Sequence, residues 1–147
     1  MVIISKIEFA TPEYDEMVKL RTDVLRKPLG MEYAIEELAR EYEDDLFAAF
    51  DHKMEIVGCL ILSQKSDKIM KMRQVAVAFE SQKKGIGQQL VAYSEWFAAD
   101  RGMKKIELHA RAPAVSFYEK LSYQIVGEPF LEVNITHLKM EKWLKKI

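Results

Sequence analysis

The fold of this chain is decided by one stretch of its sequence, Arg73-Gln74-Val75-Ala76-Val77-Ala78-Phe79-Glu80-Ser81-Gln82-Lys83-Lys84-Gly85-Ile86-Gly87-Gln88-Gln89-Leu90. An apolar run comes first, a basic loop with two glycines follows, and an amphipathic segment begins at the end. Glycine has no Cβ atom, so the backbone of such a loop can approach a ligand closely. Successive amides at a helix N-terminus form a concave site for an anion. The stretch therefore predicts a strand, an anion-binding loop and a helix, and a pyrophosphate fits that loop.

Two widespread phosphate-binding motifs do not match this loop. Walker A needs four residues between its glycines, followed by Lys-Ser/Thr. The Rossmann fingerprint needs a third glycine, and Gln88-Gln89-Leu90 stands where it would fall. A nucleotide-binding α/β domain is an alternative that rests on the glycine loop alone. Taken by itself, a Gly-x-Gly pair is also typical of an ordinary turn from a strand to a helix.

Outward from the loop, the hydrophobic pattern predicts alternating strands and helices. The elements expected before the loop are a strand 2–9, a helix from Thr11-Pro12 to Arg26, a helix 33–42, a hairpin of 46–50 and 55–62, and a strand 69–79. Those expected after it are a helix 85–101 capped by Gly102, a strand 106–110, a helix 112–121, and strands 123–126 and 134–143. This order favours a single α/β domain over residues 1–147, with one twisted mixed sheet of about six to seven strands and helices on both faces.

The composition excludes several classes of protein. Apolar residues make up 49% of the chain and charged residues 31%, which is too apolar for intrinsic disorder. Lys and Arg number 22 against 23 Asp and Glu, so no global field attracts nucleic acid or an anionic membrane, and neither partner is expected. No apolar run is long enough for a signal peptide or a membrane span, and we expect a cytoplasmic protein.

The cysteine and histidine content predicts neither a disulfide nor a metal site. Cys59 is the single cysteine, and its apolar surroundings are typical of a small buried side chain rather than a reactive thiol. One cysteine excludes an internal disulfide, which is compatible with a reducing compartment. His52, His109 and His137 show no spacing typical of metal ligands.

Three motifs resemble the GNAT N-acetyltransferases. Gln82-x-x-Gly85-x-Gly87 resembles the family signature Gln/Arg-x-x-Gly-x-Gly/Ala. Ala114-Val115-Ser116-Phe117-Tyr118-Glu119-Lys120-Leu121-Ser122-Tyr123 resembles a later helix of the family. The segment from Phe130 to Met140 resembles the ending Phe-x-Glu-x-Gly-Ile-Pro-His-x-x-Met of one bacterial branch, with Asn134 and Thr136 in place of glycine and proline. Spaced motifs on suitable elements are far harder to meet by chance than one glycine loop.

The resemblance implies a GNAT-like fold in which acetyl-CoA, the cosubstrate, lies in a V-shaped opening between two central parallel strands. The strand before the loop would hydrogen-bond the pantetheine arm, and the loop would hold the pyrophosphate. The cofactor-binding residues implied in this way are Val75, Ala76, Val77, Gln82, Lys83, Lys84, Gly85, Ile86, Gly87 and Gln88. The acceptor would be an amine on a small molecule, peptide or protein, acetylated by direct attack in a ternary complex, and a homodimer is compatible with the family.

Tyr118 matches a family tyrosine that is often assigned to the departing thiolate. A phenol has a pKa of about 10, above the value of about 8.5 for a thiol, so it can donate to the thiolate without first being deprotonated. For the proton of the amine, His109, His137 and water are all open as acceptors. A CoA-binding regulatory module without turnover is a second hypothesis, although retention of Tyr118 favours an enzyme. Ser122 stands where the family usually has glycine, so the resemblance implies a left-handed backbone there, which costs a residue with a Cβ atom about 1–2 kcal/mol.

Overall fold

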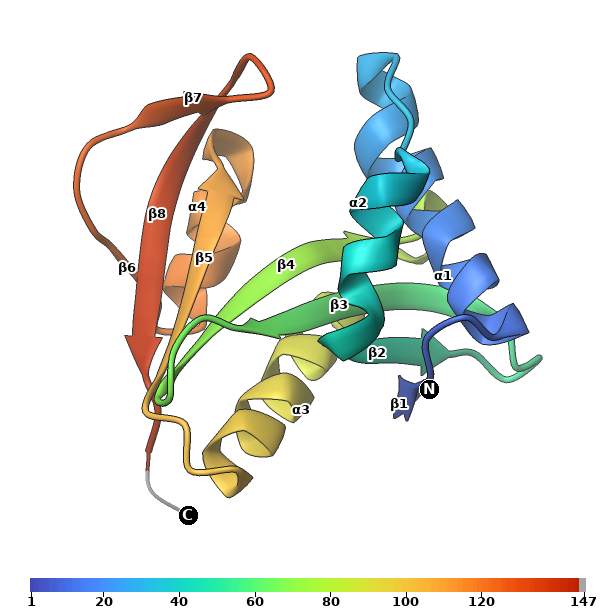
Figure 1. The fold of residues 1–147 in the computed structure, drawn as a ribbon, viewed down its shortest axis with the longest axis horizontal. Coiled ribbons are helices and arrows are strands. Elements are labelled where there is room, and N and C mark those ends of the chain that lie inside the picture. The colour runs from blue at the N-terminus through green and yellow to red at the C-terminus, as the bar shows by residue number, and fades with distance from the viewer. Residues whose placement is uncertain (146–147) are drawn as a thin grey trace. The chain divides into compact units, whose positions relative to one another are not determined.

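One mixed sheet runs through residues 1–145, the part of the chain that the computed structural model describes (Figure 1). Its strands are β1 (Ile3–Ile7), β2 (Asp45–Phe50), β3 (Ile56–Gln64), β4 (Ile69–Val77), β5 (Lys105–Arg111), β6 (Gln124–Ile125), β7 (Phe130–Glu132) and β8 (Ile135–Trp143). The strand order is β1-β2-β3-β4-β5-β8-β6, and β7 pairs with β8. The strands β4 and β5 form a parallel pair, while β1–β2, β2–β3 and β5–β8 are antiparallel. The predicted mixed sheet is therefore confirmed, with β7 as a strand that the sequence pattern did not predict.

Four α-helices connect the strands of the described chain. They are α1 (Pro12–Arg21), α2 (Ile35–Ala39), α3 (Ile86–Asp100) and α4 (Val115–Lys120). The chain divides into two compact units, the first formed by residues 1–63 and 74–94 and the second by residues 64–73 and 95–145. Among the described residues, no helix is both long and apolar enough to cross a bilayer.

In the first unit, helices cover both faces of β2 and β3. Cys59 belongs to the buried cluster that includes Tyr14 and Met17 of α1. Its neighbour Gly58 faces the other way, because successive residues of a strand alternate between the faces. A Cβ atom at Gly58 would lie 2.9 Å from Cδ1 of Leu90 on α3, so α3 packs closely on this second face. The absence of a side chain at Gly58 thus sets how near α3 lies to the sheet.

The two predicted N-terminal helices differ from the observed ones at their ends. Thr11 caps α1 as expected, since its hydroxyl accepts a hydrogen bond from the amide of Tyr14. The helix then changes into a π-helical turn at Thr22–Arg26 and a 3₁₀ turn at Lys27–Leu29, and Gly30 ends it with φ of 68°. The helix predicted over 33–42 is only α2 followed by a 3₁₀ turn.

Helical spacing in the sequence predicts that Ile35, Leu38 and Ala39 share one apolar face of this second helix, but that prediction is wrong at Ile35, which is 80% exposed. A helix of five residues completes little more than one turn, so the periodicity of its sequence fixes no buried face. The segment is anchored instead by Glu41, which is buried against the fully buried Arg21.

The second unit is built on β5, which pairs with β4 on one side and with β8 on the other. The helix α3 ends as predicted: Gly102 has φ of 81°, and the amide of Met103 donates to the carbonyl of Ala98. The expected left-handed backbone at Ser122 is also confirmed by its φ of 74°. There the amide of Tyr123 closes the end of α4 on the carbonyl of Tyr118.

Candidate functional site

The parallel pairing of β4 with β5 covers only the first part of β4. Ile69 to Met72 pair with Lys105 to Leu108, and the next pair along the strands, Arg73 with His109, is not formed. At Gln74 the backbone of β4 adopts φ of 54°, which is left-handed and uncommon for a residue that is not glycine. The alternation of a strand predicts that Met70, Met72, Gln74, Ala76 and Ala78 share one face. Four of these side chains are buried, whereas that of Gln74 is half-buried. The regular alternation expected for this strand is therefore interrupted at Gln74.

The loop after β4 is a turn that contains two residues with left-handed backbone. The side-chain amide of Gln82 donates to the carbonyl of Val77 at 3.0 Å, which ties the loop back to the end of the strand. Lys83 and Gly85 have left-handed φ angles of 63° and 82°. The carbonyl of Gly85 accepts from the amide of Gln89 at 3.1 Å, so helical hydrogen bonding begins at Gly85.

An amide in a helix donates to the carbonyl four residues earlier. The first amides of α3 have no such acceptor, because the residues four positions before them lie outside the helix. The helix begins at Ile86, and the side chains of Lys83, Lys84 and Gln88 around this end are exposed. The dipole of the helix adds partial positive charge at this end. Free amides, two cations and a glycine backbone suit a phosphate group. Since Ala76 and Ile86 are buried, those two predicted site residues can offer a ligand only their backbone.

Tyr118 lies on α4 and is only 7% exposed. Its ring contacts those of Phe117 and Tyr123 edge-on, with centroids 5.0 and 5.8 Å apart. Burial raises the pKa of the phenol above its ordinary value, so the hydroxyl is protonated at neutral pH. Within residues 1–145 no group hydrogen-bonds to this hydroxyl. It is therefore a donor still available to a ligand.

Sequence reasoning missed a contact that reaches the distorted point of β4. The hydroxyl of Tyr33 donates to the side-chain oxygen of Gln74 at 2.5 Å. Two guanidinium groups pack against the ring of Tyr33, that of Arg21 at 4.5 Å and that of Arg26 at 4.1 Å. Tyr33 and Gln74 are 41 positions apart, and nothing local in the sequence indicates that they meet.

The first unit also contains the single cysteine, whose predicted structural role is confirmed. Cys59 is fully buried, and its thiol donates weakly to the carbonyl of Gln74 at 3.6 Å. Burial raises the pKa of this thiol to about 12, so it is not a nucleophile at neutral pH.

The two histidines that the sequence offered as proton acceptors lie on adjacent strands, His109 on β5 and His137 on β8. Both approach the carboxylate of Glu132 on β7, a residue to which the sequence pattern assigned no role. Across residues 1–145, no three His, Cys, Asp or Glu side chains cluster in a way that could hold a metal ion.

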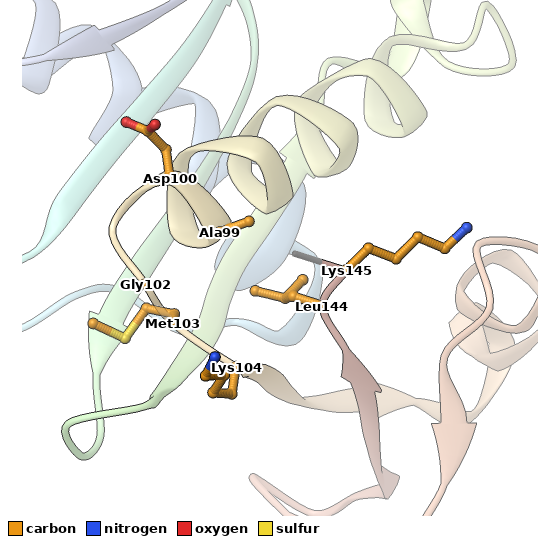
Figure 2. Close-up of a pocket in the computed structure, with 7 residues that line it drawn as sticks. All are labelled: Ala99, Asp100, Gly102, Met103, Lys104, Leu144 and Lys145. Atoms are coloured by element: carbon orange, nitrogen blue, oxygen red, sulfur yellow. The ribbon is translucent and has the colours of Figure 1, made fainter. Parts of the chain in front are cut away.

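A pocket of about 320 Å³ lies at the other end of α3 from the glycine loop (Figure 2). Its lining residues are Ala99, Asp100, Gly102, Met103, Lys104, Leu144 and Lys145. The labelled side chains come from the end of α3, the turn after it and the segment after β8. None of them belongs to a motif singled out above, and we do not place the candidate site there.

Known proteins share both the sequence pattern and the fold. A family model described as an acetyltransferase (GNAT) domain matches residues 22–144. The uncharacterized protein YyaT of Bacillus subtilis (strain 168) is 30% identical over 76 residues, which cover 52% of this chain and 51% of YyaT. The chain thus spans about half the length of the curated relatives that it matches.

Two solved structures share the fold over nearly the whole chain. An aminoglycoside 6′-N-acetyltransferase complexed with coenzyme A has a TM-score of 0.79 and 24% identity, covering 96% of each chain. A GNAT family acetyltransferase from Elizabethkingia anophelis with acetyl-CoA bound has a TM-score of 0.74 and 22% identity, covering 97% of this chain and 98% of the other. Because the family model matches well over half of the chain, this protein belongs to the GNAT acetyltransferase family.

Proposed function

We propose that this protein transfers an acetyl group from acetyl-CoA to the amine of an acceptor. The observation that carries the proposal is the geometry of the loop, in which left-handed Lys83 and Gly85 lead into the free amides of α3. The structures of the two relatives named above contain coenzyme A and acetyl-CoA, which supports the same ligand here. This proposal takes residues 1–147 as one acetyltransferase domain.

In this proposal the backbone of Val75 and Val77 receives the pantetheine arm, and the loop from Gln82 to Gln88 receives the pyrophosphate. Lys83 and Lys84 add charge-assisted contacts to the phosphates. The side chain of Gln82 holds the turn through its bond to Val77 rather than binding the ligand itself. The carbonyl of Val77 has a second lone pair, so this bond leaves it able to accept from the arm.

Transfer requires a neutral amine to attack the thioester carbonyl, so that a C–N bond forms and the C–S bond breaks. Tyr118 donates a hydrogen bond to the departing thiolate. Because burial raises the pKa of Tyr118, the phenol stabilises the thiolate as a hydrogen-bond donor and does not itself become an anion.

Binding of acetyl-CoA is tested by calorimetry with a matched pair of glycine variants. Gly85 and Gly102 have φ angles of 82° and 81°, and a Cβ atom at either meets nothing within 4 Å. Alanine at either position therefore carries the same backbone strain, about 1–2 kcal/mol. We expect Gly85→Ala to lower the affinity for acetyl-CoA at least 5-fold and Gly102→Ala to leave that affinity unchanged. Tight binding of ATP with no binding of acetyl-CoA would instead support a nucleotide-binding domain.

Turnover is tested by release of free thiol from acetyl-CoA with a panel of primary amines: spermidine, tyramine, lysine and kanamycin. Thiol release that depends on one of these amines, with the acetylated product identified by mass spectrometry, supports the enzyme. Binding of acetyl-CoA without amine-dependent release for any of them would support the CoA-binding regulatory module.

A further inference from the structure

Two histidines in the second unit share one carboxylate. His109 Nδ1 lies 3.1 Å from Oε2 of Glu132, and His137 Nε2 lies 3.8 Å from Oε1 of the same residue. The ring of Phe130 packs against both, edge-on to His109 at 4.9 Å and stacked on His137 at 5.9 Å. Glu132 and His137 belong to the Phe130–Met140 segment, so this cluster gives that motif a physical purpose.

The hydrogen-bond partners determine which nitrogen of each ring carries hydrogen. An ionised carboxylate only accepts, so Nδ1 of His109 carries the hydrogen, and the lone pair of the neutral ring is on Nε2. His137 Nδ1 likewise donates to the carbonyl of Ile135 at 2.8 Å. The side chain of His137 is 5% exposed and that of His109 is 28% exposed. Of the two rings, His109 is therefore the one that a solute can reach.

The position of His109 also suits a reaction at a thioester. On β5 it is the residue directly after Leu108, where the pairing with β4 ends. In the proposed function the pantetheine arm binds to the backbone of β4. A base at His109 would then lie at the place where the two parallel strands stop pairing.

A separate carboxylate of the second unit pairs with three lysines. Glu107 on β5 pairs with Lys65, Lys105 and Lys139. Lys71 on β4 has a lowered pKa because burial disfavours its charged form, and the charge of Glu132 opposes that effect. Arg111 follows His109 by two positions and pairs in register with His137. The carboxylate of Glu132 thus interacts with both histidines and the partly buried Lys71, while Lys65, Lys105 and Lys139 pair with Glu107.

We propose that His109 is the general base that takes the proton from the acceptor ammonium, and that Glu132 is the positioning residue that orients its ring. This inference rests on the proposed function. Nε2 of His109 accepts one proton from R–NH₃⁺, and the neutral R–NH₂ then attacks the acetyl carbonyl. The second proton lost from nitrogen ends on the CoA sulfur after the C–S bond breaks. His109 returns its proton to water, so one proton is released per turnover.

The experiment measures the pH profile of kcat/KM for two kinds of acceptor with acetyl-CoA. One is the best alkyl amine of the panel above, which is an ammonium ion at pH 7. The other is hydroxylamine, which is largely neutral there and needs no base. The variants are His109→Gln and Glu132→Gln, and His52→Gln in the exposed β2–β3 turn is the control.

General base catalysis contributes about 100-fold or more, so His109→Gln should lower kcat/KM for the alkyl amine by at least that factor at pH 7. Its rate should then rise log-linearly with pH, without the plateau of the wild type. With hydroxylamine the loss should stay below about 3-fold, because the step that needs a base is absent. Glu132→Gln should cost about 10-fold with the alkyl amine, the factor expected for one charge-assisted hydrogen bond. His52→Gln should match the wild type.

Three results would overturn the inference. If His109→Gln slows both acceptors equally, or keeps the plateau, His109 is not the base although acetyl transfer stands. If Glu132→Gln retains the full rate and profile, the carboxylate does not position the ring. If the wild type binds acetyl-CoA but acetylates neither an amine of the panel nor hydroxylamine, the proposed function is wrong. The assignment of His109 as the general base is then wrong as well.

Discussion

Gly58 on β3 lies directly against Leu90 on α3, so closely that a Cβ atom at position 58 would come within 2.9 Å of Leu90 Cδ1 and 3.0 Å of Ile86 Cγ2. Ile86 is the first residue of α3 and follows the glycine loop. The distance between β3 and α3 therefore also fixes where the amides at the start of the helix lie.

Valine at Gly58 should displace the N-terminal end of α3. We expect Gly58→Val to lower the free energy of unfolding by about 1–3 kcal/mol, because overpacking shifts the helix. The affinity for acetyl-CoA should fall as well. Ala48→Val is the control, since Ala48 is fully buried in the cluster on the opposite face with α1. Urea unfolding and calorimetry measure the two quantities. If both variants lose affinity in proportion to stability, the close packing at Gly58 has no special part in binding.

Removal of the Tyr118 hydroxyl should slow turnover without weakening binding. We expect Tyr118→Phe to lower kcat by about 100-fold, because a donor aimed at developing negative charge acts mainly in the transition state. The KM for acetyl-CoA should change less than about 2-fold. The control is Tyr123→Phe, which loses a 2.9 Å hydrogen bond to Glu95 and should cost stability but not kcat. An equal kcat for Tyr118→Phe and the wild type would remove Tyr118 from the chemistry.

Removing only one partner of the buried Arg21–Glu41 pair should destabilise the protein more than expected from the pair's net contribution. Arg21 donates to both oxygens of Glu41 at 2.8 and 2.9 Å, and Tyr14 donates to the same carboxylate at 2.6 Å. Arg21→Met or Glu41→Met should each cost about 3–5 kcal/mol, since an unpaired charge stays buried. The double variant should cost less than the sum of the two. Additive losses in urea unfolding would contradict coupling between them.

Acid should weaken the second unit partly through Glu107. Burial opposes ionisation of this carboxyl, but hydrogen bonds from Lys65 and Lys105 and the charge of Lys139 outweigh it and lower the pKa to about 2. A lowered folded pKa stabilises the protein at neutral pH, and this contribution is lost as pH falls from about 5 to about 2. The contribution should be about 1–2 kcal/mol, below the full value of the shift, because Lys65 is half exposed and water screens it. Glu107→Gln should therefore show a shallower loss of stability across that range, measured by urea unfolding at each pH.

Glycine at Ser122 should stabilise the protein. Ser122 holds φ of 74° at the end of α4, where the left-handed backbone costs a residue with a Cβ atom about 1 kcal/mol. We expect Ser122→Gly to raise the free energy of unfolding by up to that amount. Ser116→Gly is the opposite control, because Ser116 is exposed inside α4 and glycine there should lower it by about 0.5 kcal/mol. A lower melting temperature for Ser122→Gly would contradict the strain.

The sequence alone determined those features that depend on neighbours along the chain. The Thr11 cap, the Gly102 end of α3 and the strand-loop-helix unit around Gly85 are set by local backbone preferences and nearby hydrogen bonds. The motifs shared with the GNAT family are likewise short runs of neighbouring residues, which is why the amino-acid sequence suffices to recognise them.

The tertiary structure decided the contacts between residues that are distant in sequence. The Arg21–Glu41 pair joins residues 20 positions apart, Glu132 meets His109 across 23, and Tyr33 reaches Gln74 across 41. Helix and strand periodicity relate residues that lie within one element, whereas the two residues of each of these pairs do not belong to the same element. No periodic pattern in the sequence therefore indicates them. Burial of apolar faces brings these elements together, and only then do a carboxylate and an imidazole 23 residues apart become hydrogen-bond partners.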